Sequence, residues 1–338
     1  MENRNDLADK FRLFINNLKI DNPEVISRRC REICQILNLR YWDIRSDTRN
    51  LHYLGSYGRE TAVKGLTNIN VLFLLPYTVY QEYEERPGNI QELLLKDIRD
   101  LLSKTHPDAF INEEKFLLIP FEDRMTIEII PGFIGPRKNH IIYPDAQEGR
   151  WQTFNPIREI EVINEYNYKY GGKVRHLARM TRAWKMVHQV PIPGMLIDTL
   201  VMIFMDEWEG NQSSFNYYGQ MVMDFMEYLA GLRNEQLHWY AKGSNRKLER
   251  QEDFGAHANV AYKKIKQTMD LEEQGESYNA NKIWKEVFGR HFHTAVLRRD
   301  VLLQRDVLLQ RDVLSVTQHV TERTSRCNRT SRRNTAVT

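Results

Sequence analysis

The sequence predicts an α+β protein with two lobes: a small mixed sheet covered by helices, then a lobe that is almost entirely helical. A continuous apolar run at 69–75, ended by Pro76, is typical of a strand buried on both faces. Two further strand candidates occupy 115–120 and 125–130. From 157 to 292, by contrast, the apolar residues recur with the period of a helix almost throughout.

The chain before the first strand predicts two helices. Apolar residues fall on one face of a helix at 3–19. Asn22 and Pro23 then suit the N-cap and first position of a second helix. We expect these two helices to pack against a later domain as a spine. A further helix is expected at 89–103.

The segment 131–156 is rich in Gly, Pro and aromatic residues, and we expect an irregular connection lying over the sheet or the cleft. In the second lobe, helices are expected at 157–169, 173–188, 194–208, 215–232, 254–270 and 278–288. Their aromatic and methionine stripes are more typical of a core than of a ligand platform. We therefore expect a core domain with its spine helices at 1–156, a helical lobe at 157–293 and a tail at 294–338.

Length and composition are those of an ordinary globular protein. The 338 residues suffice for two subdomains, with 41% apolar and 28% charged residues. No apolar run approaches the ~20 residues of a membrane span, and the polar start lacks the apolar region of a signal peptide. We therefore expect a cytoplasmic protein with no membrane contact. The three cysteines have the spacing of neither a disulfide framework nor a zinc site.

The net charge of +3 is unevenly distributed. From 295 onward, nine arginines stand against three aspartates and one glutamate, about +5, which leaves about −2 for 1–294. The body is therefore not expected to bind nucleic acid strongly. The segment 294–338 lacks a core pattern, so we expect a weakly structured basic tail, either a solvated appendage or a contact for acidic partners.

The stretch 54–76, LGSYGRETAVKGLTNINVLFLLP, carries the strongest functional signal. It reads as a turn, the start of a helix, a loop and the buried strand. Gly55 and Ser56 at the start of a helix favour a phosphate group, because glycine lets the anion approach the backbone and the serine hydroxyl donates a hydrogen bond.

Three polar residues of two predicted strands complete the pattern. Asn68 and Asn70 point to one face of their strand, because residues i and i+2 do so. Glu128 interrupts a buried apolar strand, where a carboxylate requires a partner such as a cation. Nucleotidyl transfer uses this arrangement, with a phosphate loop, two acids separated by one residue and a third acid from a neighbouring strand to hold two divalent ions.

The stretch resembles the motif GS-x-G-R-x-TA-x-x-G-x-(S/T)-D-I-D-x-x-x-x-LP of the bacterial cGAS/DncV-like nucleotidyltransferases, within the polymerase-β superfamily. Later segments of the chain also resemble that family: RHLARMTRAWKMVHQVPIPGMLIDTLVMIFM, WYAKGSNRKLERQEDFGAHANVAY and IWKEVFGRHF. The similarity covers roughly 1–293. It implies a polymerase-β-like core with a C-terminal helical lobe. It also implies synthesis of a cyclic di- or trinucleotide signal from nucleoside triphosphates with Mg²⁺ or Mn²⁺, in CBASS anti-phage defence with accessory or effector proteins.

By this resemblance, Asn68, Asn70 and Glu128 occupy the catalytic metal-ligand positions. The nucleotide-binding positions it implies are Gly55, Ser56, Arg59, Arg182, Lys185 and Ser244. For Arg182 and Lys185 the alternative is a solvated helix face, and for Ser244 it is a plain turn between helices.

The sequence departs from the motif at 68 and 70, where Asn stands in place of the family's Asp. An amide brings no negative charge to a second divalent ion and cannot act as a base. We therefore expect an intact fold with impaired catalysis, in either an engineered inactive form or a natural pseudoenzyme that binds nucleotide without turnover. RNA tailing, or nucleotidylation of a small acceptor, is a third hypothesis, and the charge of the body argues against RNA.

Overall fold

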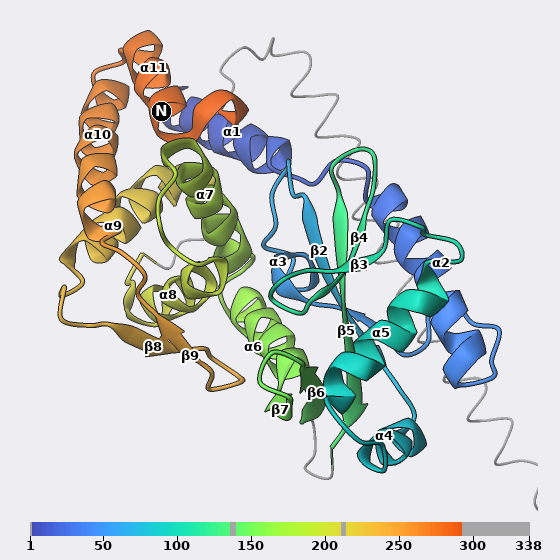
Figure 1. Cartoon of the computed structure of the whole chain (residues 1–338). Helices are drawn as coiled ribbons and strands as arrows, with labels where there is room; N and C mark the ends of the chain where they lie inside the picture. Colours follow the sequence, from blue (N-terminus) through green and yellow to red (C-terminus); the bar gives the residue numbers. More distant parts are fainter. Residues whose placement is uncertain (1, 136–139, 211–213, 293–338) are drawn as a thin grey trace, which may run out of the picture. The chain divides into compact units, whose positions relative to one another are not determined.

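The computed structural model describes residues 2–135, 140–210 and 214–292, with side chains from Asp6 onward (Figure 1). The expected tail at 294–338 lies outside these residues. Within the described ranges, no helix combines the length and the apolar character needed to cross a bilayer.

The strands are β1 (Leu51–Tyr53), β2 (Asn68–Leu74), β3 (Phe110–Ile111), β4 (Leu117–Pro120), β5 (Thr126–Ile134), β6 (Ile141–Asp145), β7 (Arg150–Phe154), β8 (His238–Tyr240) and β9 (Lys247–Glu249). The α-helices are α1 (Glu2–Asn17), α2 (Pro23–Tyr41), α3 (Gly55–Gly58), α4 (Tyr77–Glu84), α5 (Ile90–Leu102), α6 (Pro156–Lys169), α7 (Lys173–His188), α8 (Gly194–Glu207), α9 (Tyr218–Gly231), α10 (Gly255–Glu273) and α11 (Ser277–Phe288). Two short 3₁₀ helices are η1 (Phe215–Tyr217) and η2 (Gly289–His291). The predicted α+β class, with a mixed sheet followed by a helical lobe, is confirmed.

The sheet has the strand order β1-β2-β5-β4-β3, and β6 and β7 extend it from the far end of β5. β2 and β5 run parallel, whereas β1, β4 and β6 pair antiparallel with their neighbours. Parallel strands need a crossover, and α4, α5, β3 and β4 supply it here. β2 lies inside the sheet between β1 and β5, which explains why its sequence is apolar on both faces.

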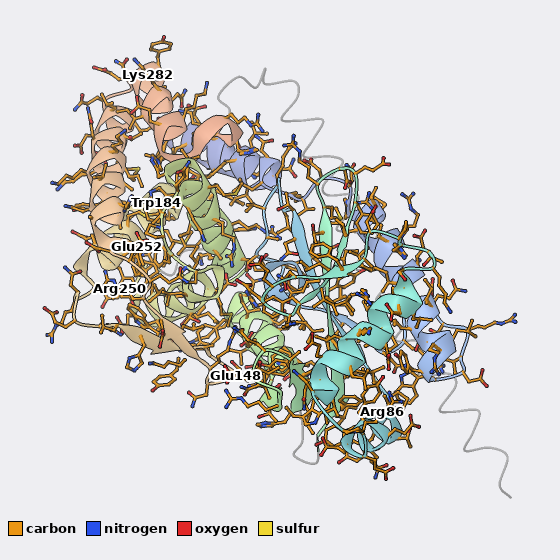
Figure 2. The ribbon with its side chains drawn as sticks, in the orientation of Figure 1. Arg86, Glu148, Trp184, Arg250, Glu252 and Lys282 are labelled. Atoms are coloured by element: carbon orange, nitrogen blue, oxygen red, sulfur yellow. The ribbon has the colours of Figure 1, made fainter. Side chains whose placement is uncertain are left out.

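The two expected spine helices belong to different hydrophobic cores. Ile26, Ile33 and Leu37 of α2 lie in the core of the sheet. α1 instead belongs to the core of the helical lobe, where Phe11 packs at right angles on Trp284. Figure 1 shows α1 beside α11 and α2 beside the sheet. The α7 side chain Trp184, labelled in Figure 2, is 1% exposed in the helical core.

The prediction of an irregular connection at 131–156 is wrong. β5 continues to Ile134, and the hairpin of β6 and β7 follows it, so most of this segment is strand. Two of its aromatic residues pack in the sheet core: Phe133 and Trp151 meet edge to face at 5.6 Å. Gly132 is required in β5, because a Cβ there would lie 2.6 Å from the Leu72 side chain.

Two other local features differ from expectation. The hairpin of β8 and β9 lies in the lobe that the sequence predicts as almost all helix. Asn22 precedes α2, but its backbone is left-handed, with φ 52°, and its side chain makes no capping hydrogen bond. Pro23 at the first position still favours the start of the helix, because its ring fixes a helical φ.

Candidate active site

The turn at α3 fixes the backbone around Ser56. Gly55 has φ +61°, which favours glycine, and the Leu54 amide donates to the carbonyl of Asn70 at 2.8 Å. Gly58 ends the helix, and a Cβ there would lie 2.2 Å from the Tyr53 carbonyl oxygen. The short helix is therefore packed tightly against β1 at Gly58, while Gly55 supplies the left-handed backbone at its start.

The parallel pair of β2 and β5 brings the three predicted catalytic positions together. Asn70 lies opposite Glu128 in the register, and the Asn68 side chain hydrogen-bonds to Glu128. Burial raises the pKa of Glu128 above its usual range, the hydrogen bond from Asn68 partly offsets this, and the negative charge of Glu114 raises it further. The cluster therefore has one carboxylate with amide neighbours.

A cavity of about 250 Å³ adjoins this cluster. Ser56 and Asn68 line it, together with residues of the connecting loop at 62–67. Arg182 and Lys185 of α7 also line it. The cavity thus has a hydroxyl and two basic side chains around a volume that a phosphate group can enter.

Lys185 is the basic residue with donors to spare. Its Nζ donates to the Ile192 carbonyl at 2.6 Å, the one hydrogen bond recorded for this ammonium in the described structure. An ammonium has three N–H donors, so two are available to an anion. Burial lowers the pKa of Lys185, and the positive charge of Arg182 lowers it further. An entering phosphate would favour its charged form.

Arg182 lines the same cavity, but internal partners engage most of its donors. Its Nη1 and Nη2 donate to the two oxygens of Asp198 at 2.6 and 2.9 Å. The same nitrogens also donate to the carbonyls of Ala178 and Gly194. The solvated helix face that the sequence leaves open for Arg182 is therefore wrong, because the residue is 7% exposed.

Arg59 and Ser244 also have internal partners. Arg59 is 5% exposed, and its Nε donates to Asp198 at 2.8 Å. Ser244 donates to Glu159 at 2.6 Å, and Glu159 lies 3.7 Å from the Arg59 guanidinium. Neither Arg59 nor Ser244 is among the residues that line the cavity. A nucleotide-binding role for these two residues therefore stays a prediction.

Asp198, which the sequence reasoning missed, connects these side chains. It is fully buried in α8, and Thr61 donates to it at 3.1 Å. Burial alone would raise its pKa, but the charges of Arg182 and Arg59 hold the pKa of Asp198 below its usual range. A signal was present in the sequence, since Asp198 is the lone acid within the apolar run of residues 195–205.

The residues present do not fit a two-metal site. Asn68, Asn70 and Glu128 offer a single carboxylate, whereas two divalent ions require several. Across the described ranges, no group of three His, Cys, Asp or Glu side chains could hold a metal ion. Glu114 is close enough for its charge to act on Glu128, but within the described ranges it completes no group of three ligands that would compensate for the departure from the Asp-x-Asp pattern.

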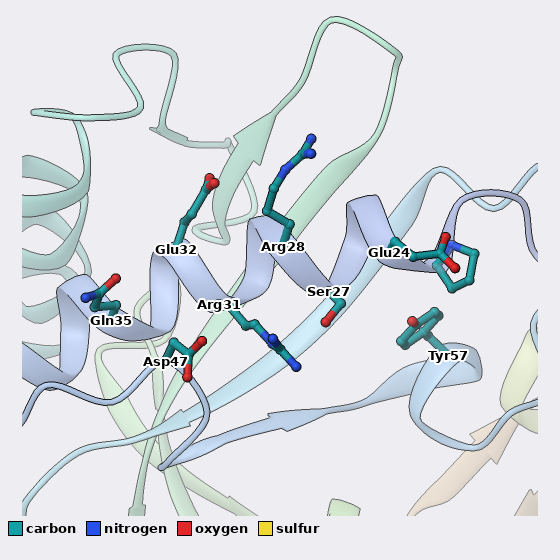
Figure 3. Close-up of a pocket in the computed structure, with 9 residues that line it drawn as sticks. Glu24, Ser27, Arg28, Arg31, Glu32, Gln35, Asp47 and Tyr57 are labelled. Atoms are coloured by element: carbon teal, nitrogen blue, oxygen red, sulfur yellow. The ribbon is translucent and has the colours of Figure 1, made fainter. Parts of the chain in front are cut away.

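A larger hollow, of about 690 Å³, lies along the outer face of α2 (Figure 3). Figure 3 shows that Arg28 and Glu32 project from one side of the helix and Arg31 from the other. Its charged side chains carry both signs and do not converge, so they form no common anion site. Tyr57 of α3, the residue after Ser56 in the sequence, also lines this hollow.

Comparison with known proteins agrees with this geometry. Residues 6–167 match the model of the Second Messenger Oligonucleotide or Dinucleotide Synthetase domain (SMODS). A probable cyclic nucleotide synthase of Bacillus cereus (strain VD146) is 24% identical over 273 residues, which cover 70% of this chain and 80% of that protein.

Solved structures share the fold at low identity. E. coli MS115-1 CdnC with ATP has a TM-score of 0.61 at 13% identity, over 84% of this chain and 98% of that one. The cyclic AMP-GMP synthase DncV of Vibrio cholerae, a prokaryotic cGAS homolog, has a TM-score of 0.56 at 13% identity, over 86% of this chain and 88% of that one. The domain match, the curated relative and the shared fold lead to one conclusion: residues 6–167 are a SMODS domain by similarity, and the chain has the fold of the bacterial cGAS/DncV-like nucleotidyltransferases.

Proposed function

We propose that this chain binds a nucleoside triphosphate in the cavity beside α3 and α7, and that it is a cyclic di- or trinucleotide synthase with impaired turnover. One arrangement carries the proposal. Asn70 lies opposite Glu128, and Asn68, which lines the cavity, hydrogen-bonds to Glu128. We extend it, on the family's biology, to an anti-phage signal that accessory or effector proteins receive.

The roles of the side chains follow from their chemistry. The Ser56 hydroxyl donates to a phosphate oxygen, and the Lys185 ammonium adds a charge-assisted hydrogen bond. The buried strands beneath Asn68 and Glu128 keep that side of the cavity rigid. Divalent ions would supply activation of the attacking hydroxyl, and the two asparagines lack the charge to hold them.

Restoring the two acids tests the proposal. We expect the double variant Asn68→Asp/Asn70→Asp to convert labelled triphosphates, with Mg²⁺ or Mn²⁺, at least ~100-fold faster than the chain as it stands, because metal-ion stabilisation of charge is worth several kcal/mol. Adding Glu128→Gln to the double variant is the control and should abolish the gain. The absence of any cyclic or linear product from ATP, GTP, CTP and UTP, with or without phage-derived activators, would contradict the proposal.

One observation favours a natural pseudoenzyme as a second candidate. Asn68 already gives Glu128 a hydrogen bond that favours its ionised form, so the carboxylate has a partner other than a cation. A binder of this kind should bind triphosphate in calorimetry with a dissociation constant that changes little when Mg²⁺ is omitted. A strictly Mg²⁺-dependent affinity, or asparagine codons missing from the chromosomal gene, would exclude it.

A further inference from the structure

Asp198 is the acceptor for side chains from two parts of the chain that are far apart in sequence. On one side, Arg59 and Thr61 of the loop after α3 donate to its Oδ2 at 2.8 and 3.1 Å. On the other side, both terminal nitrogens of Arg182 in α7 donate to it. All of these side chains are less than 9% exposed, so water does not compete for the hydrogen bonds.

The loop that Asp198 holds also fixes the backbone of Ser56. The amides of Thr61 and Ala62 both donate to the Ser56 carbonyl, at 2.9 and 3.0 Å. Moving Thr61 would therefore move the carbonyl, and with it the side chain that lines the cavity. Asp198 is thus connected to the Ser56 peptide through Thr61 alone, by one hydrogen bond on each side of that residue.

The part of the cavity lining that α7 contributes is fixed through Arg182. Arg182 and Lys185 lie one turn apart on α7 and line the same cavity. Asp198 and the Gly194 carbonyl together hold the Arg182 guanidinium toward α8. Lys185 is thereby left as the lining side chain with N–H groups available to an incoming anion, while Arg182 serves as a fixed support.

The buried charges balance only when Asp198 is ionised. Arg59 and Arg182 bring two positive charges, and Asp198 with Glu159 brings two negative ones. Buried charges are tolerated when they are paired and hydrogen-bonded. A neutral side chain at 198 would leave two guanidinium charges against the single carboxylate of Glu159, and their repulsion would favour a larger separation.

We propose that Asp198 is a positioning residue for triphosphate binding, holding the Ser56 loop and α7 at the spacing that the phosphates require. It touches no nucleotide itself and acts through Thr61, Arg59 and Arg182. The proposal rests on the proposed function of the cavity. It also assigns Arg59 a supporting role in place of direct contact with the phosphates.

Two variants, each with a matched control, test this. Asp198→Asn removes the charge, and Thr61→Val removes one hydrogen bond without exposing a buried charge. Glu272→Gln is the control for the first, because Glu272 is a 6%-exposed carboxylate paired with Lys10 in the helical core. Thr268→Val is the control for the second, because the fully buried Thr268 donates to a carbonyl of its own helix.

Calorimetry on the full chain, with whichever of ATP, GTP, CTP or UTP binds best, gives the dissociation constant, and thermal melting gives the stability. We expect Asp198→Asn to weaken binding about tenfold or more and Thr61→Val about threefold, because small displacements of positioning groups are costly. The two controls should stay within about twofold even where their melting temperatures fall, because neither contacts the cavity. Hydrogen–deuterium exchange should accelerate at the Thr61 and Ala62 amides in the two site variants alone.

Unchanged affinity together with unchanged exchange at 56–63 in folded Thr61→Val would overturn the proposal, even if Asp198→Asn fails to fold. Weakened binding in the controls equal to that in the site variants would also overturn it, because the effect would then be one of general stability. If the parent chain binds no triphosphate, the proposed function fails. The exchange data then still decide whether Asp198 positions the Ser56 loop.

Discussion

Glu128 and Asp198 are two carboxylates near the same cavity. Glu128 is half-buried and Asp198 is buried, and the charges that surround them differ. Glu128 has asparagines as neighbours, and burial raises its pKa. Asp198 has two guanidiniums, and their charges lower its pKa despite complete burial. Asp198 is therefore a carboxylate that supports the structure, whereas the charge of Glu128 has no cationic partner among the described residues. An acid of the second kind marks the place where a ligand would be expected.

The largest expected difference between them is in stability. We expect Asp198→Ala to lower the free energy of unfolding by about 3–5 kcal/mol, because it leaves the buried Arg182 without its carboxylate and Arg59 with Glu159 alone. Glu128→Ala should change it by about 1 kcal/mol or less, because no cation depends on that carboxylate. Urea denaturation of both variants gives the two values. Equal losses would show that Glu128 also supports the fold and would remove the contrast.

A smaller effect is expected on binding, at the basic residue that the Asp198 cluster leaves available. Lys185→Gln should weaken triphosphate binding about tenfold, the value of one charge-assisted hydrogen bond, with little change in melting temperature. Lys282→Gln, at an exposed position of α11 labelled in Figure 2, removes the same charge far from the cavity. Calorimetry at fixed ionic strength should find that control unchanged. A similar loss in both variants would indicate long-range charge rather than contact.

The smallest effect is a pH dependence of opposite sign at the two acids. The folded pKa of Glu128 lies above its ordinary value of 4.5, so the folded state is penalised as pH rises from 4.5 through the raised pKa. Glu128→Gln should therefore be as stable as the parent below pH 4.5 and more stable above this window. Asp198 contributes stability above its ordinary 3.8 and loses it as pH falls through the lowered pKa.

Unfolding curves between pH 3 and 8 for the parent, Glu128→Gln and Asp198→Asn measure both dependences. The gain in Glu128→Gln should grow with rising pH, and the deficit in Asp198→Asn should shrink at low pH. Parallel curves for the parent and Glu128→Gln would mean that Glu128 has a cationic partner.

Local patterns were sufficient to predict much of this molecule. The period-two spacing of Asn68 and Asn70 predicts a shared strand face, and the apolar run around them predicts β2. The helices of the second lobe follow from period and caps, within a residue or two at most ends. The hairpin of β6 and β7 was missed because glycines and prolines interrupt its alternation, and its pairing with β5 depends on register.

The internal partners of Arg59 and Ser244 could not be predicted in the same way. Arg59 meets Asp198 across 139 positions in sequence, and Ser244 meets Glu159 across 85. Period and motif give residue types along the chain, but they do not say which buried charges will pair. The resemblance alone does not say whether Arg59 and Ser244 contact the nucleotide or support other residues. Their hydrogen bonds in the folded chain bear on that question.

The placement of α1 in the helical core has a consequence for the order of folding. Lys10 pairs with Glu272, 262 positions later, and Phe11 packs on Trp284. During synthesis α1 is made well before these partners, which lie near the end of the described chain. Contacts of such long sequence separation form late, because closing the loop between them costs entropy first. We therefore expect α1 to be among the last of the described helices to reach its final position.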